Sequence, residues 1–114
     1  MKDDLLGILE HMIEDCQDIS AFITEVATEN EMWNNKMCRK AIIMSILNLG
    51  ELTKLLEKHI ELPMQKIDWK GLKGMREIAA HRYRTLSSDI VWDVAVNEIP
   101  EIYEFLKQQR ENIV

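Results

Sequence analysis

The sequence is poor in residues that make tight turns or cross-links. Its 114 residues include only four glycines, two prolines and two cysteines. So few glycines and prolines argue against a β protein, in which short strands are separated by turns rich in these residues. Cys16 and Cys38 lie in apolar segments without metal-ligand spacing, and we interpret them as reduced core thiols in preference to a disulfide or a catalytic thiol.

The sequence also lacks a hydrophobic run long enough to cross a membrane, which takes about 20 residues. The longest apolar stretch, AIIMSILNLG (41–50), is interrupted by Ser45 and Asn48. The first residues are acidic, whereas a signal peptide begins with a basic segment. We therefore expect a cytoplasmic protein that does not contact a membrane.

Apolar residues recur at three- and four-residue spacing, which is typical of amphipathic helices. The pattern predicts a helix over about 3–19, which residues 22–26 either extend or follow as a short second element. A longer helix is predicted from Trp33 or Lys36 to Lys58, and its apolar surface spans more than one face. Such a helix is either central to a bundle or shared with a second copy. The length is that of one domain, residues 1–114.

A third helix is predicted to begin after Asp68, a good N-cap residue, and to bury a stripe over 69–79. Gly71 and Gly74 are candidates for a close helix contact. The polar segment 85–89 breaks the pattern, and a last helical region follows, in which Pro100 either kinks the helix or starts a new one. Together, these segments predict an all-α bundle of four to five helices.

The charge is acidic overall, with a net value of −6, but it is unevenly distributed. Residues 66–84 contain six basic and two acidic side chains, so this window is +4 and the rest of the chain is −10. The acidic remainder argues against nonspecific duplex binding by the whole surface. The one basic window holds the candidate site.

That site is formed by Arg76, His81 and Tyr83 in the segment MREIAAHRYR (75–84). On a continuous helix Arg76 and Tyr83 share a face, whereas His81 lies about 140° from Arg76. All three can therefore meet in one cleft only if the helix ends near residues 81–83. The spacing alone favours a simpler interpretation, in which cationic side chains stabilise a helix C-terminus.

A functional interpretation rests on the chemistry of these side chains. Histidine can act as an acid or a base near neutral pH, and arginine can bind two phosphate oxygens. An Arg and a His suffice for RNA cleavage without a metal: the His moves a proton at the ribose 2′-OH or the leaving oxygen, and the Arg stabilises the charge on the phosphate. One His rarely does both, so a two-fold dimer would supply the second pair.

The segment REIAAHRY (76–83) resembles the R-x4-H-x-Y signature of HEPN-domain proteins, specifically HepT-like toxins. The resemblance covers nearly the whole chain in order and spacing. The other segments that carry it are LLGILEHMIEDCQDIS (5–20), NLGELTKLLEKH (48–59), IDWKGLKGMR (67–76) and SDIVWDVAVNEIPEIYEFL (88–106). Two positions depart from the family pattern: Glu77 stands where Asn or Asp often follows the Arg, and Glu98 where Asp is common.

The resemblance implies a HEPN-like helical bundle that forms a two-fold homodimer around a shared cleft. It further implies a metal-independent endoribonuclease toxin without a cofactor, acting on RNA such as tRNA. Its antitoxin partner would be the minimal nucleotidyltransferase MntA, which transfers AMP to a tyrosine. Residue by residue, Arg76 and His81 carry over as catalytic and Tyr83 as the AMP acceptor, with Glu77 as possible support and Lys73, Arg82 and Arg84 as possible phosphate-binding residues.

Two alternatives stay open. In the first, the chain is a noncatalytic HEPN subunit of a nucleotidyltransferase, in which Arg76 and His81 bind a nucleotide or the partner. In the second, it is a structural helical dimer whose polar cluster only caps a helix. Trp33, Trp69 and Trp92 could stack on bases, but at helical spacing we expect them in the core or a dimer interface.

Overall fold

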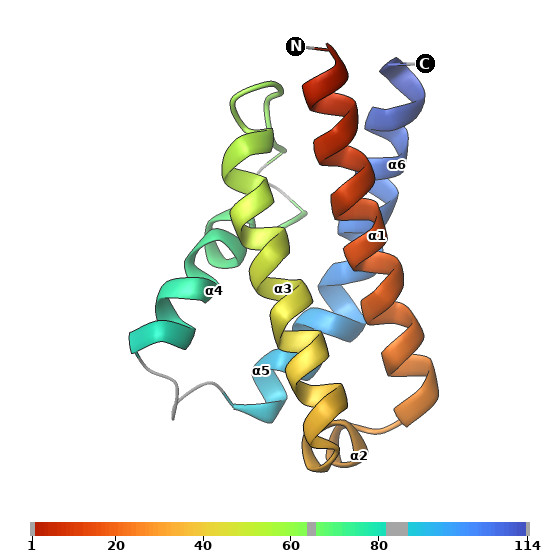
Figure 1. Ribbon diagram of the computed structural model, residues 1–114, viewed down its shortest axis with the longest axis vertical. Coiled ribbons are helices and arrows are strands. Elements are labelled where there is room, and N and C mark those ends of the chain that lie inside the picture. The colour runs from red at the N-terminus through yellow and green to blue at the C-terminus, as the bar shows by residue number, and fades with distance from the viewer. Residues whose placement is uncertain (1, 64–65, 82–86, 114) are drawn as a thin grey trace.

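A computed structural model of the chain describes residues 2–63, 66–81 and 87–113. In chain order it contains α1 (Lys2–Val26), α2 (Glu29–Asn34), α3 (Lys36–Leu56), α4 (Trp69–His81), α5 (Ser88–Asp93), the π-helical turn η2 (Val94–Glu98) and α6 (Ile99–Ile113). Because α5, η2 and α6 follow one another without a gap, they form one bent helix (Figure 1). No strand occurs in these described ranges, and the predicted all-α bundle is confirmed.

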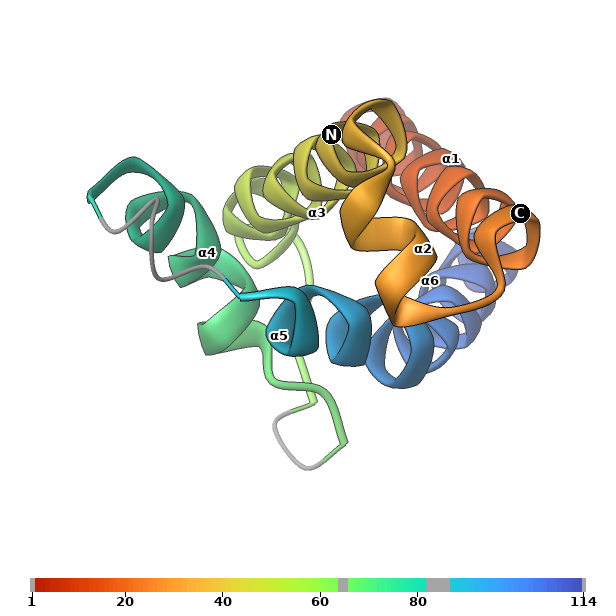
Figure 2. The ribbon, with the colours of Figure 1, turned by 90° about the horizontal axis from the view of Figure 1, so that it is seen from below.

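The core lies between α1, α3 and α6, with α1 running opposite to the other two (Figures 1 and 2). Each of the three helices contributes a stripe of side chains with at most 1% of their surface exposed: Leu9, Met12, Cys16, Ile19, Ile42, Ile46, Leu49, Leu56, Ile99, Ile102 and Leu106. Burying one large aliphatic side chain stabilises the fold by about 1.5–3 kcal/mol. The amphipathic periodicity of the sequence therefore places these three helices together.

Short polar motifs set the ends of the first helices. α1 extends beyond the predicted end at residue 19 and reaches Val26, where Ala27 has a φ of 67°. Such a left-handed residue is a common helix terminator, although glycine adopts it at less cost. The hydroxyl of Thr28 then caps α2 by accepting a hydrogen bond from the Glu31 amide at 3.1 Å, and the side chain of Asn35 caps α3. The predicted polar connection thus contains a short capped helix.

Helix α4 begins where the sequence predicts, directly after Asp68. The Asp68 carboxylate accepts a hydrogen bond from the Gly71 amide at 2.9 Å, and Ile67 and Leu72 are both buried beside this cap. Trp69 donates from Nε1 to the Pro63 carbonyl at 3.0 Å, and its ring meets that of Phe105 edge-on at 5.4 Å. These contacts fix the first turn of α4 against α6.

The close contact between α3 and α4 is made by Gly50, and not by the two glycines of α4. A Cβ on Gly50 would collide with the backbone carbonyl of Leu72. The three atoms nearest to a Cβ on Gly71 all belong to the capping carboxylate of Asp68, and a Cβ on Gly74 would meet nothing within 4 Å. The expectation of a close contact at Gly71 and Gly74 was therefore wrong, because the small residue is needed on the opposite helix.

The bend before α6 coincides with a proline. The Ile99 amide donates to the carbonyl of Val94, five residues back, which makes η2 a π-helical turn. Pro100 is the second residue of α6, and a proline inside a continuous helix bends it. Of the two predicted roles for Pro100, the kink is the one observed, because α5, η2 and α6 follow one another without a gap.

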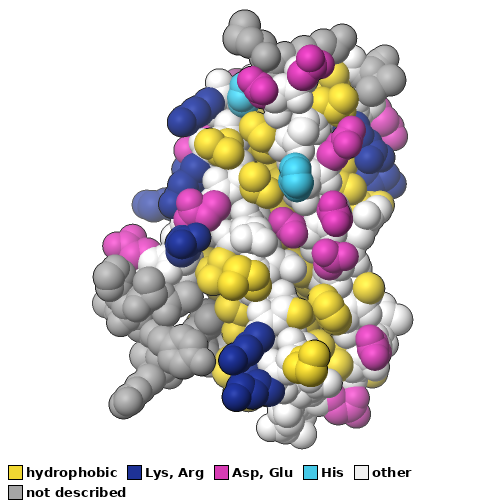
Figure 3. Space-filling view, viewed as in Figure 1, with side chains coloured by type: hydrophobic (Ala, Val, Ile, Leu, Met, Phe, Trp, Pro, Cys, Tyr) yellow, Lys and Arg dark blue, Asp and Glu magenta, His cyan; other side chains and the backbone are white. Residues whose placement is uncertain are grey.

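The apolar stripe predicted for α3 is only partly buried. Met37, Met44 and Leu55 are 84%, 58% and 44% exposed and lie on its outer face. Figure 3 shows apolar side chains spread over this face of the molecule, along α3 and the neighbouring α1. The broad apolar surface of α3 thus serves the core on one side and is uncovered on the other. Among the described helices, none is both long and apolar enough to span a bilayer.

Candidate active site on helix α4

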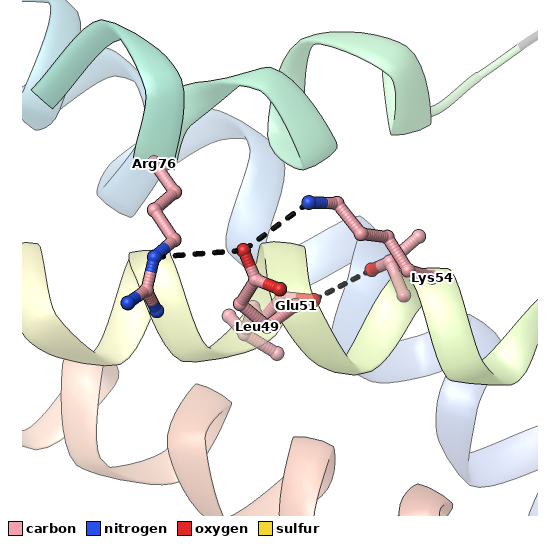
Figure 4. Close-up of polar contacts among 5 residues, drawn as sticks. Leu49, Glu51, Lys54 and Arg76 are labelled. Atoms are coloured by element: carbon pink, nitrogen blue, oxygen red, sulfur yellow. Dashed lines mark hydrogen bonds and ion pairs between the residues drawn. The ribbon is translucent and has the colours of Figure 1, made fainter. Parts of the chain in front are cut away.

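Arg76 lies on α4, directly after the buried residues Leu72 and Met75. Its neighbour Met75 is buried, whereas the Arg76 side chain is 66% exposed. The guanidinium points from α4 towards α3, and its Nε lies 3.8 Å from Oε1 of Glu51 (Figure 4). The two terminal nitrogens point away from this carboxylate. Among the described residues these two nitrogens have no ion-pair partner, so Arg76 offers a pair of N–H donors at the surface, an arrangement that can bind two phosphate oxygens.

Glu51 is shared between two cationic side chains. The same Oε1 atom lies 3.2 Å from Nζ of Lys54, one turn further along α3. In the same stretch of α3, the Thr53 hydroxyl donates to the Leu49 carbonyl at 2.7 Å and so satisfies a buried polar group. Arg76, Lys54 and Glu51 form a small charged cluster at the α3–α4 seam, with one positive charge in excess.

Lys73, a predicted phosphate-binding residue, lies one turn before Arg76. Its Nζ is 2.8 Å from Oε2 of Glu57, the C-cap residue of α3. Glu77 is exposed on α4. Of the predicted site residues, the structure thus places Lys73, Arg76 and Glu77 within two turns of one helix.

The other predicted site residues can be placed only in part. His81 is the last described residue of α4, and the structure describes its backbone but not its side chain. Arg82, Tyr83 and Arg84 lie outside the described residues. The expectation that Arg76, His81 and Tyr83 meet in one cleft therefore stays a prediction.

The cysteines and tryptophans that the structure places in or beside the core have structural positions. Cys16 and Cys38 are buried and free, and burial raises the pKa of the Cys16 thiol to about 12, so neither is a reactive thiolate. Trp69 is in the core, as expected. Trp33 is half-buried and lies under the guanidinium of Arg39, 5.2 Å from the ring centre. The described part of the chain holds no cluster of three or more His, Cys, Asp or Glu side chains that could bind a metal.

Sequence analysis did not identify Glu51 and Lys54 as site residues. The signal was present in the segment NLGELTKLLEKH, where charged residues recur at three-residue spacing in an otherwise apolar helix. Only the packing of α4 on Gly50 shows which of these charges face Arg76. A spacing pattern on one helix does not specify its partner on another.

Comparison with known proteins gives a consistent set of relatives. The family model described as Ribonuclease HepT-like matches residues 9–109. "Putative RNase MJ0127" of Methanocaldococcus jannaschii is 30% identical over 110 residues, covering 93% of this chain and 90% of that protein. "Putative RNase MJ1216" of the same organism is 33% identical over 113 residues, covering 99% and 89%.

A bacterial relative extends the comparison. "Putative RNase TTE0752" of Caldanaerobacter subterraneus is 27% identical over 100 residues, covering 88% of each chain. No solved structure matches this chain. The span matched by the family model includes all of α3 and α4, and with them the cluster around Arg76.

Proposed function

Because the chain belongs to the HepT-like ribonuclease family, we propose that it is a metal-independent cytoplasmic endoribonuclease in which Arg76 and His81 carry the reaction. The observation that supports this most is the Arg76 side chain. It is exposed, it is paired through Nε with Glu51, and among the described residues its terminal nitrogens have no ion-pair partner that would compete with a phosphate. His81 follows on the same helix, five residues later.

The proposed reaction is transesterification within the RNA strand. His81 or its counterpart in a second subunit removes the proton of a ribose 2′-OH, and the 2′ oxygen attacks the adjacent phosphorus. The bond from phosphorus to the 5′ oxygen breaks, and this oxygen takes a proton from the second histidine. Arg76 stabilises the added negative charge on the phosphate oxygens in the transition state. The products are a 2′,3′-cyclic phosphate and a 5′-OH.

Purified protein incubated with tRNA and EDTA tests the proposal. We expect cleavage by the wild type, and a decrease of about 10²–10⁴-fold for His81→Ala, the usual range for a general acid or base. Arg76→Ala should lower the rate by about 10²–10³-fold. Ile90→Glu is a suitable control, since it changes an exposed side chain in the first turn of α5, where a carboxylate is favoured. Equal RNA patterns with wild type and His81→Ala would refute the nuclease proposal.

We also propose that two copies form a two-fold dimer through the outer face of α3. This face presents Met37, Met44 and Leu55 next to the Arg76–Glu51 pair. Packing these side chains against their equivalents would bury the apolar surface and bring two Arg76–His81 pairs towards one cleft. Met44→Glu should therefore give a monomer in sedimentation experiments and lose cleavage, whereas Ile90→Glu should remain dimeric. A Met44→Glu variant that stays dimeric would exclude this face.

The regulatory part of the proposal concerns Tyr83. We propose that an MntA-type nucleotidyltransferase antitoxin transfers AMP to its hydroxyl and so silences a toxin. The added phosphate would carry negative charge and bulk into the segment that contains Arg82 and Arg84. Intact mass spectrometry after incubation with such an enzyme and ATP should show a gain of AMP that Tyr83→Phe abolishes. A gain that persists in Tyr83→Phe would place the modification elsewhere.

The same experiments separate the noncatalytic alternative. A binding subunit would leave RNA intact in every form, and Arg76→Ala would instead weaken binding of the nucleotidyltransferase or of its nucleotide. The strong acidity outside residues 66–84 is compatible with such docking. Cleavage that depends on His81 would exclude this alternative.

A further inference from the structure

Glu51 is an acidic residue at the centre of the proposed phosphate-binding surface. Its Oε1 lies 3.8 Å from Nε of Arg76 and 3.2 Å from Nζ of Lys54 (Figure 4). A carboxylate repels RNA phosphates, so at this position it weakens substrate binding. We therefore expect Glu51 to have a function that compensates for this weaker binding of RNA.

Glu51 is not needed to hold α4 against α3. The Arg76 and Glu51 side chains are 66% and 38% exposed and separated by 3.8 Å, and ion pairs of this kind contribute little to stability. A second pair, Lys73–Glu57, already joins the two helices at 2.8 Å. The buried contacts of Leu72 and Met75 hold the helix in addition.

The geometry points to a role in orienting the guanidinium. An exposed arginine side chain samples many rotamers, and fixing it in one costs entropy when the substrate binds. Oε1 of Glu51 lies 3.8 Å from Nε on one edge of the guanidinium, and the two terminal nitrogens point away from this carboxylate (Figure 4). The two terminal nitrogens can engage two oxygens of a phosphate together.

We infer that Glu51 is a positioning residue, which holds Arg76 through Nε so that its terminal nitrogens meet the scissile phosphate. The inference rests on the proposed ribonuclease function. Lys54 shares the same carboxylate oxygen and so limits its attraction for Arg76. The guanidinium is thereby held in place without being drawn fully onto Glu51, and it remains available to RNA.

The kinetic test compares Glu51→Gln with Glu57→Gln, because each variant removes one carboxylate from an α3–α4 ion pair. Both variants lose a negative charge near the basic surface, so KM for RNA should fall a few-fold in both. Only Glu51→Gln should lose kcat, by about 10-fold, because Arg76 is no longer oriented for the transition state. Glu51→Asp, which keeps the charge, should recover part of kcat. Equal kcat values for the two Gln variants would overturn the inference.

A second measurement does not depend on cleavage. The Nε–Hε NMR resonance of Arg76, assigned by its loss in Arg76→Lys, reports the ion pair directly. It should shift and its hydrogen should exchange faster in Glu51→Gln, and it should be unchanged in Glu57→Gln. An unchanged Arg76 resonance in Glu51→Gln would overturn the inference even in a protein that cleaves RNA. Conversely, a wild type that cleaves no RNA but shows the shift would refute the proposed function and leave the arginine–glutamate contact established.

Discussion

The bundle of α1, α3 and α6 differs from α4 in how its surfaces are used. The three bundle helices face one another around a shared core, and each contributes several side chains without exposed surface. Helix α4 lies outside this bundle against α3 and touches α6 through its first residue, Trp69 (Figure 2). Within α4, Trp69, Leu72 and Met75 are buried, whereas Arg76 and Glu77 are exposed. Among the described side chains, burial is thus concentrated in the bundle and in α4 up to Met75, and the proposed catalytic Arg76 follows directly.

The largest expected effect is a cavity in the bundle. Ile102 is 1% exposed on α6, and Ile102→Ala should lower the free energy of unfolding by about 3 kcal/mol. Urea denaturation followed by circular dichroism measures this loss. The control is Ile90→Ala, which truncates an apolar side chain that is 45% exposed and should cost under about 0.5 kcal/mol. Similar losses in both variants would contradict the distinction between core and surface.

A smaller effect on stability is expected at the seam between the two regions. Gly50→Ala would place a methyl group against the Leu72 carbonyl, and the resulting strain should cost about 2 kcal/mol. Because α4 must shift to relieve it, RNA cleavage under native conditions should fall by more than the loss of folded protein explains.

Gly7→Ala is the matched control for this substitution. A Cβ at Gly7 meets nothing within 4 Å, and alanine is the better helix former. The control should therefore be neutral or stabilising by up to about 1 kcal/mol. A Gly50→Ala variant with wild-type stability and cleavage would show that α4 is not fixed by this contact.

The smallest effect concerns the pH dependence of the bundle. Burial and, next, the neighbouring Asp18 raise the pKa of Asp15 to about 6 from an ordinary value of 3.8. The folded state therefore binds the Asp15 proton more tightly, and this contribution to stability is lost as pH rises from about 4 to about 6.

Asp15→Asn should remove that dependence and raise stability at pH 7. We expect about 1 kcal/mol, well below the full value of the pKa shift, because the side chain is only half-buried. Denaturant titrations at pH 4.5 and pH 7 measure the change. Parallel pH profiles for wild type and Asp15→Asn would contradict a raised Asp15 pKa.

The bundle could be predicted from the sequence because the signals for its helices come from residues that are close together in the chain. The three-to-four-residue periodicity identifies α1, α3 and α6, and Asp68 marks the first turn of α4 by a hydrogen bond three residues away. Such signals depend on neighbours along one helix. They need no knowledge of how the helices are arranged.

The parts that could not be predicted depend on contacts between helices. Met37 and Met44 follow the apolar period as well as any core residue does, so the sequence cannot show that they face outward. Gly50 is required only because the backbone of Leu72 comes close to it. Glu51 is the one carboxylate within α3, but the sequence does not show that it faces Arg76, since this relation arises from the placement of α4.

The π-helical turn at Val94–Glu98 has a consequence for the length of related chains. The Ile99 amide bonds five residues back, so this turn accommodates one residue more than an α-helical turn. A homologous chain with one residue fewer at this point could form an uninterrupted α-helix in which the residues before and after the turn keep their present orientation. The turn therefore marks a place where a single-residue insertion or deletion leaves the core intact, and alignments across the family should allow a gap there.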